Sequence, residues 1–172
     1  KVLIFICVLY PLLRIYEYFP VTMLLEWAYS YDVQRGQSLQ YRFDQEKDLL
    51  ARAQEKIFSG WGGWGRNRIY DLETGADISI TDGRWIIVLG IYGMVGFVAE
   101  FGLLLYPVYK ATSLVQKIKD SKVKILLSSF SLILVIYVVD LLPNDPLSPL
   151  TWLIAGALYG NVEYQNKLRN SK

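Results

Sequence analysis

The chain has 172 residues, of which 53% are hydrophobic and 15% aromatic, so its composition is too apolar for an ordinary water-soluble domain and predicts a membrane protein. Its net charge of +2, from 18 basic and 16 acidic residues, argues against a nucleic-acid-binding protein. Because Cys7 is the single cysteine and histidine is absent, intrachain disulfides, the usual zinc sites and histidine-dependent catalytic dyads or triads are excluded.

The first apolar run, residues 2–13, is shorter than the roughly 20 residues that cross a bilayer. We interpret residues 1–13 as the end of a truncated transmembrane helix, and the chain as the C-terminal part of a longer polytopic protein. Residues 15–31 then mix tyrosine and tryptophan with charged side chains, which is typical of the headgroup region. This segment is therefore predicted to lie at the membrane interface.

Residues 14–83 are predicted to form one large loop outside the membrane. Apolar residues recur at helical spacings from residue 39 to residue 57, which predicts a helix with Ser38 as its N-cap and its end at Gly60. Arg42 and Glu46, four residues apart, are expected to pair on this helix. The alternation over residues 78–81 indicates a short extended piece.

The rest of the chain is predicted to contain three membrane spans. These are residues 84–109, 125–142 and 150–163, joined by a connector at 110–124 and a turn at 143–149, and followed by a tail at 164–172. Small residues recur every third position in the first span, which predicts close packing against several neighbouring helices: Gly90, Gly93, Gly96, Ala99 and Gly102. The lysine-bearing connector and basic tail are assigned to the cytoplasm, so the loop faces the opposite side.

The large loop has no net charge, but it is rich in arginine. Between residues 35 and 84 there are eight basic and eight acidic residues, and six of the chain's eight arginines lie there. Arginine presents a planar fork that suits phosphate or pyrophosphate oxygens. The alternative is that these arginines only pair with the neighbouring carboxylates on a solvated surface.

Carboxylates are the common general bases that remain in a chain without histidine. The candidates in the loop are Glu46, Asp71, Asp77 and Asp82, with helix capping and arginine pairing as the alternative for each. Their spacing is not that of a dedicated metal-binding loop, so no metal site and no cofactor is assigned. Trp61 and Trp64 are expected either to stack on sugar rings or to anchor the loop at the headgroups.

Several motifs together resemble the O-antigen ligase/polymerase-like membrane protein family. They are Ser38-Leu39-Gln40-Tyr41-Arg42, Glu46, Leu50-Ala51-Arg52-Ala53, Gly60-Trp61-Gly62-Gly63-Trp64-Gly65-Arg66-Asn67-Arg68, the Asp71, Gly75 and Asp82-Gly83 spacing, and the Leu142-Pro143-Asn144, Ser148-Pro149-Leu150 and Ala155-Gly156-Ala157-Leu158 segments. The resemblance implies an all-α polytopic membrane protein with a GT-C-like helical bundle, in the bacterial cytoplasmic membrane, whose large periplasmic loop contains a helix.

The resemblance also implies an activity and roles for residues. The family member would be a metal-independent glycosyltransferase of lipopolysaccharide or exopolysaccharide biosynthesis, moving a glycan from undecaprenyl pyrophosphate to an acceptor hydroxyl. By this likeness the catalytic residues are Arg42, Arg66, Arg68, Glu46 and Asp71, and the substrate-binding residues are Arg35, Arg52, Trp61, Trp64 and Asp82. The ligase branch typically carries a functional loop histidine, which this chain lacks, so a polymerase or an uncharacterised relative is favoured over a ligase. The alternatives from other classes are a non-enzymatic transporter or flippase of lipid-linked glycans, and a structural subunit whose loop docks a partner.

Overall fold

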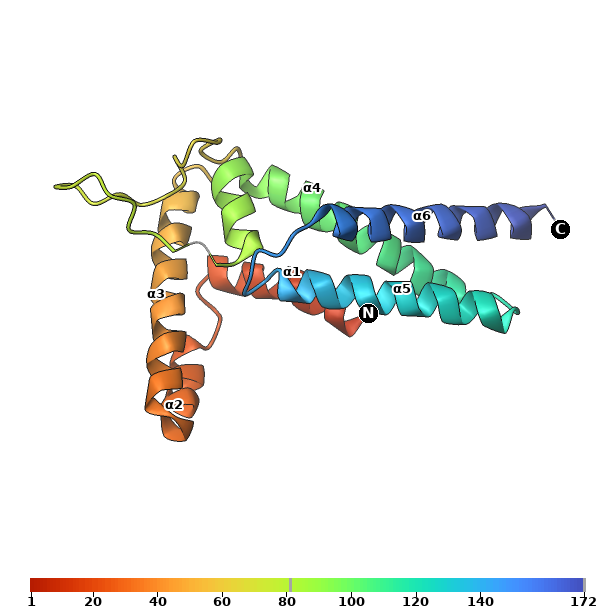
Figure 1. Cartoon of the computed structure of the whole chain (residues 1–172), viewed down its shortest axis with the longest axis horizontal. Coiled ribbons are helices and arrows are strands. Elements are labelled where there is room, and N and C mark those ends of the chain that lie inside the picture. Colours follow the sequence, from red (N-terminus) through yellow and green to blue (C-terminus); the bar gives the residue numbers. More distant parts are fainter. Residues whose placement is uncertain (81, 172) are drawn as a thin grey trace. The chain divides into compact units, whose positions relative to one another are not determined.

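The computed structural model describes residues 1–80 and 82–171 and divides the chain into two compact units. We call residues 9–97 the loop unit, and residues 1–8 with 98–172 the span unit. The described residues form six helices in chain order: α1 (Val2–Ile15), α2 (Val21–Tyr31), α3 (Val33–Gln54), α4 (Arg84–Val115), α5 (Ser121–Asp140) and α6 (Pro149–Asn170) (Figure 1). The described residues contain no β-strand, only an isolated bridge between Tyr70 and Asp77, so the all-α prediction is confirmed.

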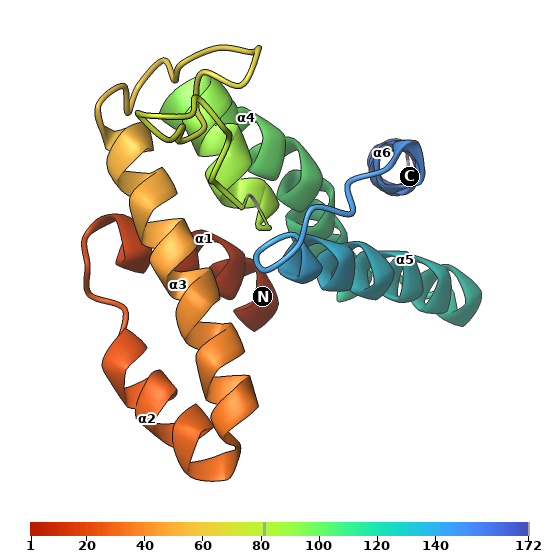
Figure 2. The same cartoon turned by 60° about the vertical axis from the view of Figure 1, so that its left-hand side comes forward.

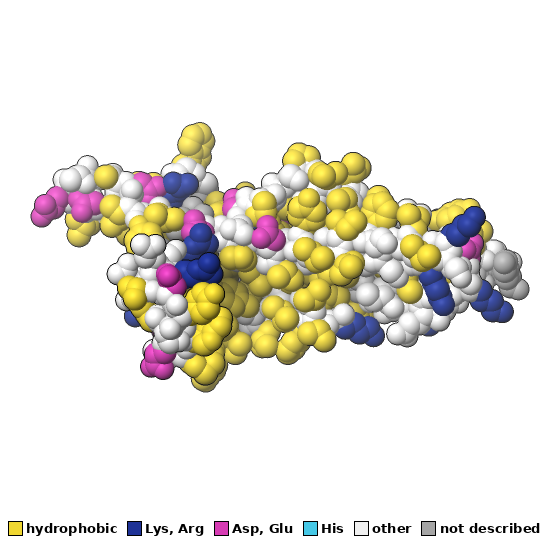
Figure 3. All heavy atoms as spheres, turned by 60° about the horizontal axis from the view of Figure 1, so that its bottom comes forward, with side chains coloured by type: hydrophobic (Ala, Val, Ile, Leu, Met, Phe, Trp, Pro, Cys, Tyr) yellow, Lys and Arg dark blue, Asp and Glu magenta, His cyan; other side chains and the backbone are white. Residues whose placement is uncertain are grey.

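Two helices of the described chain, α4 and α5, are long and apolar enough to cross a membrane. Their mean hydropathies are 2.0 and 2.1, and only 28% of the apolar stretch of α5 is buried within the protein. Large hydrophobic side chains of both helices are accordingly exposed, and apolar side chains cover much of the face drawn in Figure 3. Both helices support the assignment to a membrane protein.

The third predicted span, residues 150–163, lies within α6. By the same criterion of length and composition α6 does not qualify, because Asn161 and Glu163 interrupt its apolar stretch and Lys167 and Arg169 follow. The crossing of the membrane by α6 stays a prediction. The first apolar run forms the short helix α1, whose bounds agree with the predicted helical end at residues 1–13 to within two residues.

The connector predicted over residues 110–124 is partly helical. Helix α4 continues to Val115 and α5 begins at Ser121, so residues 116–120 join the two helices within that connector. Asp120 caps α5 by accepting a hydrogen bond from the backbone N–H of Lys122 at 2.8 Å. Such a cap satisfies a backbone N–H group that has no partner within the first turn of a helix. The helix therefore begins here although lysines lie nearby.

Helices α2 and α3 form a tight hairpin in the loop unit (Figure 2). Asp32 is the only residue between them, and its carboxylate accepts from the backbone N–H of Arg35 at 2.8 Å. A Cβ on Gly36 would lie 2.6 Å from Cγ of Tyr29, so the two helices approach one another closely at this glycine. Tyr29 also donates to Gln40 at 2.6 Å.

The prediction that Ser38 caps the long loop helix was therefore wrong. The helix begins at Val33 with Asp32 as its cap, and it ends at Gln54, before the predicted end at Gly60. Both Asp32 and Ser38 are good capping residues, but Asp32 stands at the start of the helix and its side chain accepts from Arg35, whereas Ser38 lies inside the helix. The extended piece expected at 78–81 includes Thr81, which lies outside the described residues; residues 78–80 form no strand.

Candidate functional site

Helix α4 is broken at Gly93, and the glycine-rich loop fits into the break. Gly93 has φ 66° and ψ −165°, so the carbonyls of Gly90 and Ile91 lose the amide donors that a continuous helix supplies four residues later. The loop replaces these bonds: Trp61 and Gly62 donate to Gly90 and Ile91, each at 2.8 Å. In return Met94 and Val95 donate to loop carbonyls, those of Ile57 at 2.7 Å and Phe58 at 3.4 Å. We call this exchange between residues 57–62 and 90–95 the backbone clasp.

The clasp explains two glycines in α4. A Cβ on Gly93 would lie 2.7 Å from the amide nitrogen of Gly60, and both residues have positive φ, 66° and 68°. A Cβ on Gly90 would lie 3.0 Å from Cβ of Asn67, a loop residue that is only 5% exposed. The predicted packing of these small residues against neighbouring helices was wrong for Gly90 and Gly93, because the loop takes that space.

Two basic side chains lie over the ring of Trp61, next to the backbone clasp. The Arg52 guanidinium lies 3.4 Å from the Trp61 ring centroid and the Lys56 ammonium 4.2 Å from it. The indole N–H donates to the carbonyl of Arg52 at 2.7 Å, and Arg52 donates to the carbonyl of Arg66 at 3.4 Å. We call Arg52, Lys56 and Arg66 the basic cluster.

Arg66 is held at the rim of this cluster and stays accessible. Its Nε donates to the carbonyl of Gly63 at 3.1 Å, and the residue is exposed. One carboxylate offsets part of the cluster's charge, that of Glu55, which lies 2.9 Å from Arg52. The cluster therefore keeps an excess of positive charge beside Trp61, in a form suited to an anion.

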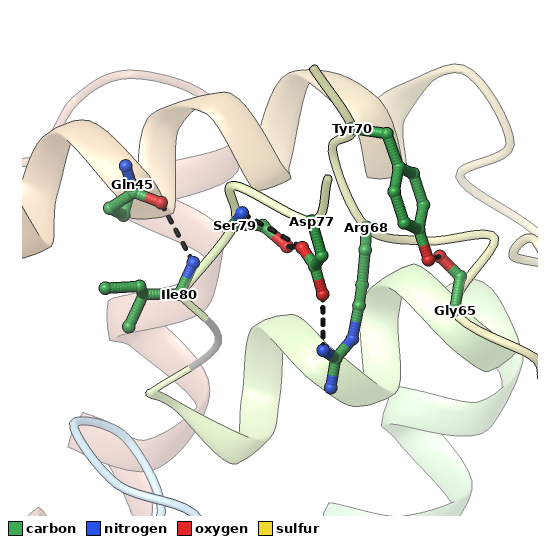
Figure 4. Close-up of polar contacts among 7 residues, drawn as sticks. All are labelled: Gln45, Gly65, Arg68, Tyr70, Asp77, Ser79 and Ile80. Atoms are coloured by element: carbon green, nitrogen blue, oxygen red, sulfur yellow. Dashed lines mark hydrogen bonds and ion pairs between the residues drawn. The ribbon is translucent and has the colours of Figure 1, made fainter. Parts of the chain in front are cut away.

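Two other predicted arginines lie in ion pairs. Arg42 approaches Asp82 at 3.7 Å, with both side chains about half exposed, so two predicted site residues meet here. Arg68 binds Asp77 at 2.5 Å, and the close-up in Figure 4 shows Asp77 also accepting from Ser79. The Arg68 hydrogen bond, reinforced by Ser79, lowers the pKa of Asp77 and in turn raises that of Arg68.

Asp71 closes a turn. Its carboxylate accepts from the backbone N–H of Glu73 at 3.0 Å and of Thr74 at 2.7 Å, and from the Thr74 hydroxyl at 2.8 Å. These hydrogen bonds, led by those from Thr74, lower the pKa of Asp71. A carboxylate stabilised in this way is a weaker base. The turn belongs to a small hairpin-shaped loop over residues 69–79, whose two arms meet at the isolated bridge between Tyr70 and Asp77.

Glu46 lies in a largely buried charge pair with Arg14. The two side chains are 14% and 9% exposed, the Arg14 Nε donates directly to the carboxylate, and the Tyr10 hydroxyl donates to its other oxygen at 2.9 Å. Arg14 also lies over the ring of Phe43, 5.1 Å from its centroid. The expected pair between Arg42 and Glu46 does not form, because each finds a partner far away in the sequence.

The remaining predicted residues lie apart from the basic cluster. Arg35 is at the start of α3, over the Tyr31 ring, and the 17 residues to Arg52 correspond to about 25 Å of helix. Trp64 is 96% exposed and has φ 68°, a conformation that costs a non-glycine residue energy and is often found where a side chain is presented to a ligand.

Four residues of this region were not among the predicted site residues: Tyr10, Arg14, Lys56 and Asn67. Lys56 carried a usable signal, because it lies four residues after Arg52 in a helical pattern and so shares its face. Arg14 and Asn67 meet their partners only in the tertiary fold, so no spacing in the nearby sequence predicts these contacts. No protein-family model, curated protein or solved structure matches the chain.

Proposed function

We propose that the chain is part of a membrane glycosyltransferase of the O-antigen or exopolysaccharide polymerase type. It would transfer a glycan from undecaprenyl pyrophosphate to an acceptor sugar hydroxyl, at the periplasmic face of the bacterial cytoplasmic membrane, in a GT-C-like bundle. The observation that carries the proposal is the basic cluster, which adjoins a helix able to span a membrane. Arg52 and Lys56 lie over the Trp61 ring, and Arg66, whose backbone carbonyl accepts from Arg52, holds its guanidinium at the Gly63 carbonyl. Trp61 itself is hydrogen-bonded to α4.

The cluster suits a diphosphate leaving group. Transfer of the glycan leaves negative charge on the pyrophosphate, and cations that are already in place stabilise that charge without reorganising. Arg66 has an exposed guanidinium whose Nε is occupied by Gly63, so its terminal nitrogens remain available for phosphate oxygens. The donor's polyprenyl chain would remain in the bilayer beside the spans.

Two exposed groups outside the basic cluster offer polar and aromatic surface for an acceptor. Asp82 is 42% exposed and is held by Arg42, so it is suited to accept a hydrogen bond from an acceptor hydroxyl. Trp64 offers an exposed aromatic face for a sugar ring. Glu46 and Asp71, the bases implied by the family resemblance, are already engaged by Arg14 and by the Asp71 turn.

The test uses the full-length protein, purified and supplied with a lipid-linked repeat unit. Arg66→Lys keeps the positive charge but removes the planar guanidinium group that can bind two phosphate oxygens. Lys56→Gln removes one positive charge from the cluster. Each is expected to lower kcat/KM for glycan transfer by about tenfold to a hundredfold, which corresponds to the roughly 1.5–3 kcal/mol of one charge-assisted hydrogen bond. Matched controls are Arg169→Lys in the C-terminal tail and Lys47→Gln, an exposed lysine of α3.

The outcomes separate the candidate functions. Release of undecaprenyl pyrophosphate by the wild type, lost in both cluster variants but not in the controls, supports the transferase. Movement of the lipid-linked unit across the membrane without release of undecaprenyl pyrophosphate would identify a flippase. Transfer of the glycan to a lipid A core sugar would identify a ligase. Equal activity in all four variants would contradict the assignment of the cluster to the donor.

A further inference from the structure

Helix α2 has three distinct faces. Ala28 and Tyr29 pack toward α3, where Ala28 is buried and Tyr29 contacts Gly36. Thr22, Glu26 and Ser30 form an exposed polar row at four-residue spacing. A second exposed row lies one residue further along the helix, about 100° around its axis, and all of its side chains are apolar or aromatic. We call this second row, Met23, Trp27 and Tyr31, the α2 stripe.

The α2 stripe is far more exposed than apolar side chains usually are. Met23 is 61% exposed, Trp27 70% and Tyr31 74%. Two tyrosines of the preceding turn, Tyr16 and Tyr18, are also exposed, at 66% and 78%. A contiguous row of large apolar side chains on the outside of a helix indicates a surface that meets something other than water.

We propose that the α2 stripe inserts into the headgroup region of a lipid bilayer, so that α2 lies in the plane of the membrane surface. Tryptophan and tyrosine are the residue types that favour this layer, because their rings are apolar and their N–H and O–H groups stay hydrated. This inference goes beyond the proposed function, since it concerns how the hairpin of α2 and α3 is supported whether or not the loop transfers glycan.

Charge and size favour lipid as the occupant. The Arg35 guanidinium lies over the Tyr31 ring, 5.6 Å from its centroid, at the end of the stripe, where it can meet lipid phosphate. From residue 23 to 31 the stripe is about 12 Å long. A stable protein interface takes about 800 Å² from each partner, more than one such row offers, whereas shallow insertion into lipid needs only a narrow apolar row beside a polar one.

The test measures the environment of single spin labels in the full-length protein in phosphatidylcholine and phosphatidylglycerol nanodiscs. Labels are placed at Met23→Cys and Trp27→Cys in the stripe, and at Thr22→Cys and Glu26→Cys in the polar row of the same helix, with Cys7 replaced by alanine. Collision rates with oxygen, which concentrates in lipid, are compared with those of a water-soluble nickel chelate. We expect a several-fold higher ratio of oxygen to nickel collisions at the two stripe positions than at the two polar positions.

Two results would overturn the proposal. Equal and high nickel accessibility at all four positions would show that the stripe faces water. Low accessibility of Met23→Cys and Trp27→Cys to both reagents would show that protein covers it. Each variant is first checked for the wild-type pattern of limited trypsin cleavage, so that unfolding is not mistaken for exposure. Quenching of a bimane label at Met23→Cys by lipids brominated near the headgroup, more than by lipids brominated deep in the chain, provides an independent measurement.

Discussion

Gly60 and Gly93 meet backbone to backbone: a Cβ on Gly93 would lie 2.7 Å from the amide nitrogen of Gly60. We expect Gly93→Ala to destabilise the loop unit by roughly 1–3 kcal/mol or more, because it adds a clash to a residue that needs positive φ. The measurement is thermal unfolding in detergent together with protease sensitivity of the loop. Gly102→Ala in the same helix is the matched control, since a Cβ there meets nothing within 4 Å. Equal stability of the two variants would contradict the clasp.

The charge pair of Arg14 and Glu46 is expected to support the fold. Glu46→Gln leaves a largely buried guanidinium without its charge partner, and we expect a loss of roughly 3 kcal/mol in the free energy of unfolding. The double variant Arg14→Met with Glu46→Leu should lose much less, because no buried charge remains. Denaturant unfolding of the single and double variants measures this difference. If Glu46→Gln keeps full stability but makes no glycan product, Glu46 acts as the base and not as a structural partner.

The hairpin over residues 69–79 should loosen in acid. Hydrogen bonds lower the pKa values of Asp71 and Asp77, so the stability they contribute is complete above the ordinary carboxyl pKa of 3.8. It is lost as the pH falls from 3.8 through the lower values of the folded state. A spin label at Leu72→Cys, on the exposed hairpin, should therefore become more mobile below about pH 3.8. In an Asp77→Asn background the same label should already be mobile at neutral pH, and a label that is equally rigid in both backgrounds would contradict the role of the Arg68 pair.

Two candidate caps of α3 can be compared directly. Asp32→Ala removes the carboxylate that accepts from the Arg35 N–H and should cost about 1 kcal/mol. Ser38→Ala lies inside the helix and should change stability by less than about 0.5 kcal/mol. Thermal unfolding of both variants under the same conditions provides the measurement. A larger effect at Ser38 would place the start of the helix where the sequence alone suggested it.

The helical class and the two apolar spans could be predicted from the sequence, because long apolar runs without charge form helices that bury their own backbone polar groups. The cluster of glycines that begins at Gly60 also indicated a loop whose backbone is in close contact with another group. What it contacts could not be read, because the clasp to Ile91 is made of main-chain groups, which every residue shares.

The candidate site was predicted less well than the fold. Arg52 and Arg66 come together, but Arg35, Arg42 and Arg68 lie elsewhere with partners of their own. In a loop with equal numbers of acidic and basic residues, the choice of partner depends on distances that only the tertiary fold sets. Glu46 is the clearest example, since its partner Arg14 is 32 positions away.

The amides of Trp61 and Gly62 donate hydrogen bonds to α4, and the carbonyls of Ile57 and Phe58 accept hydrogen bonds from it. The number of loop residues between Ile57 and Gly62 is therefore fixed. One inserted or deleted residue would shift the donors and acceptors out of register with Gly90 and Ile91 together. Surface loops ordinarily tolerate such changes. Natural variants of this protein should therefore differ in length at the turn over residues 72–75 and keep a constant count of residues through the clasp.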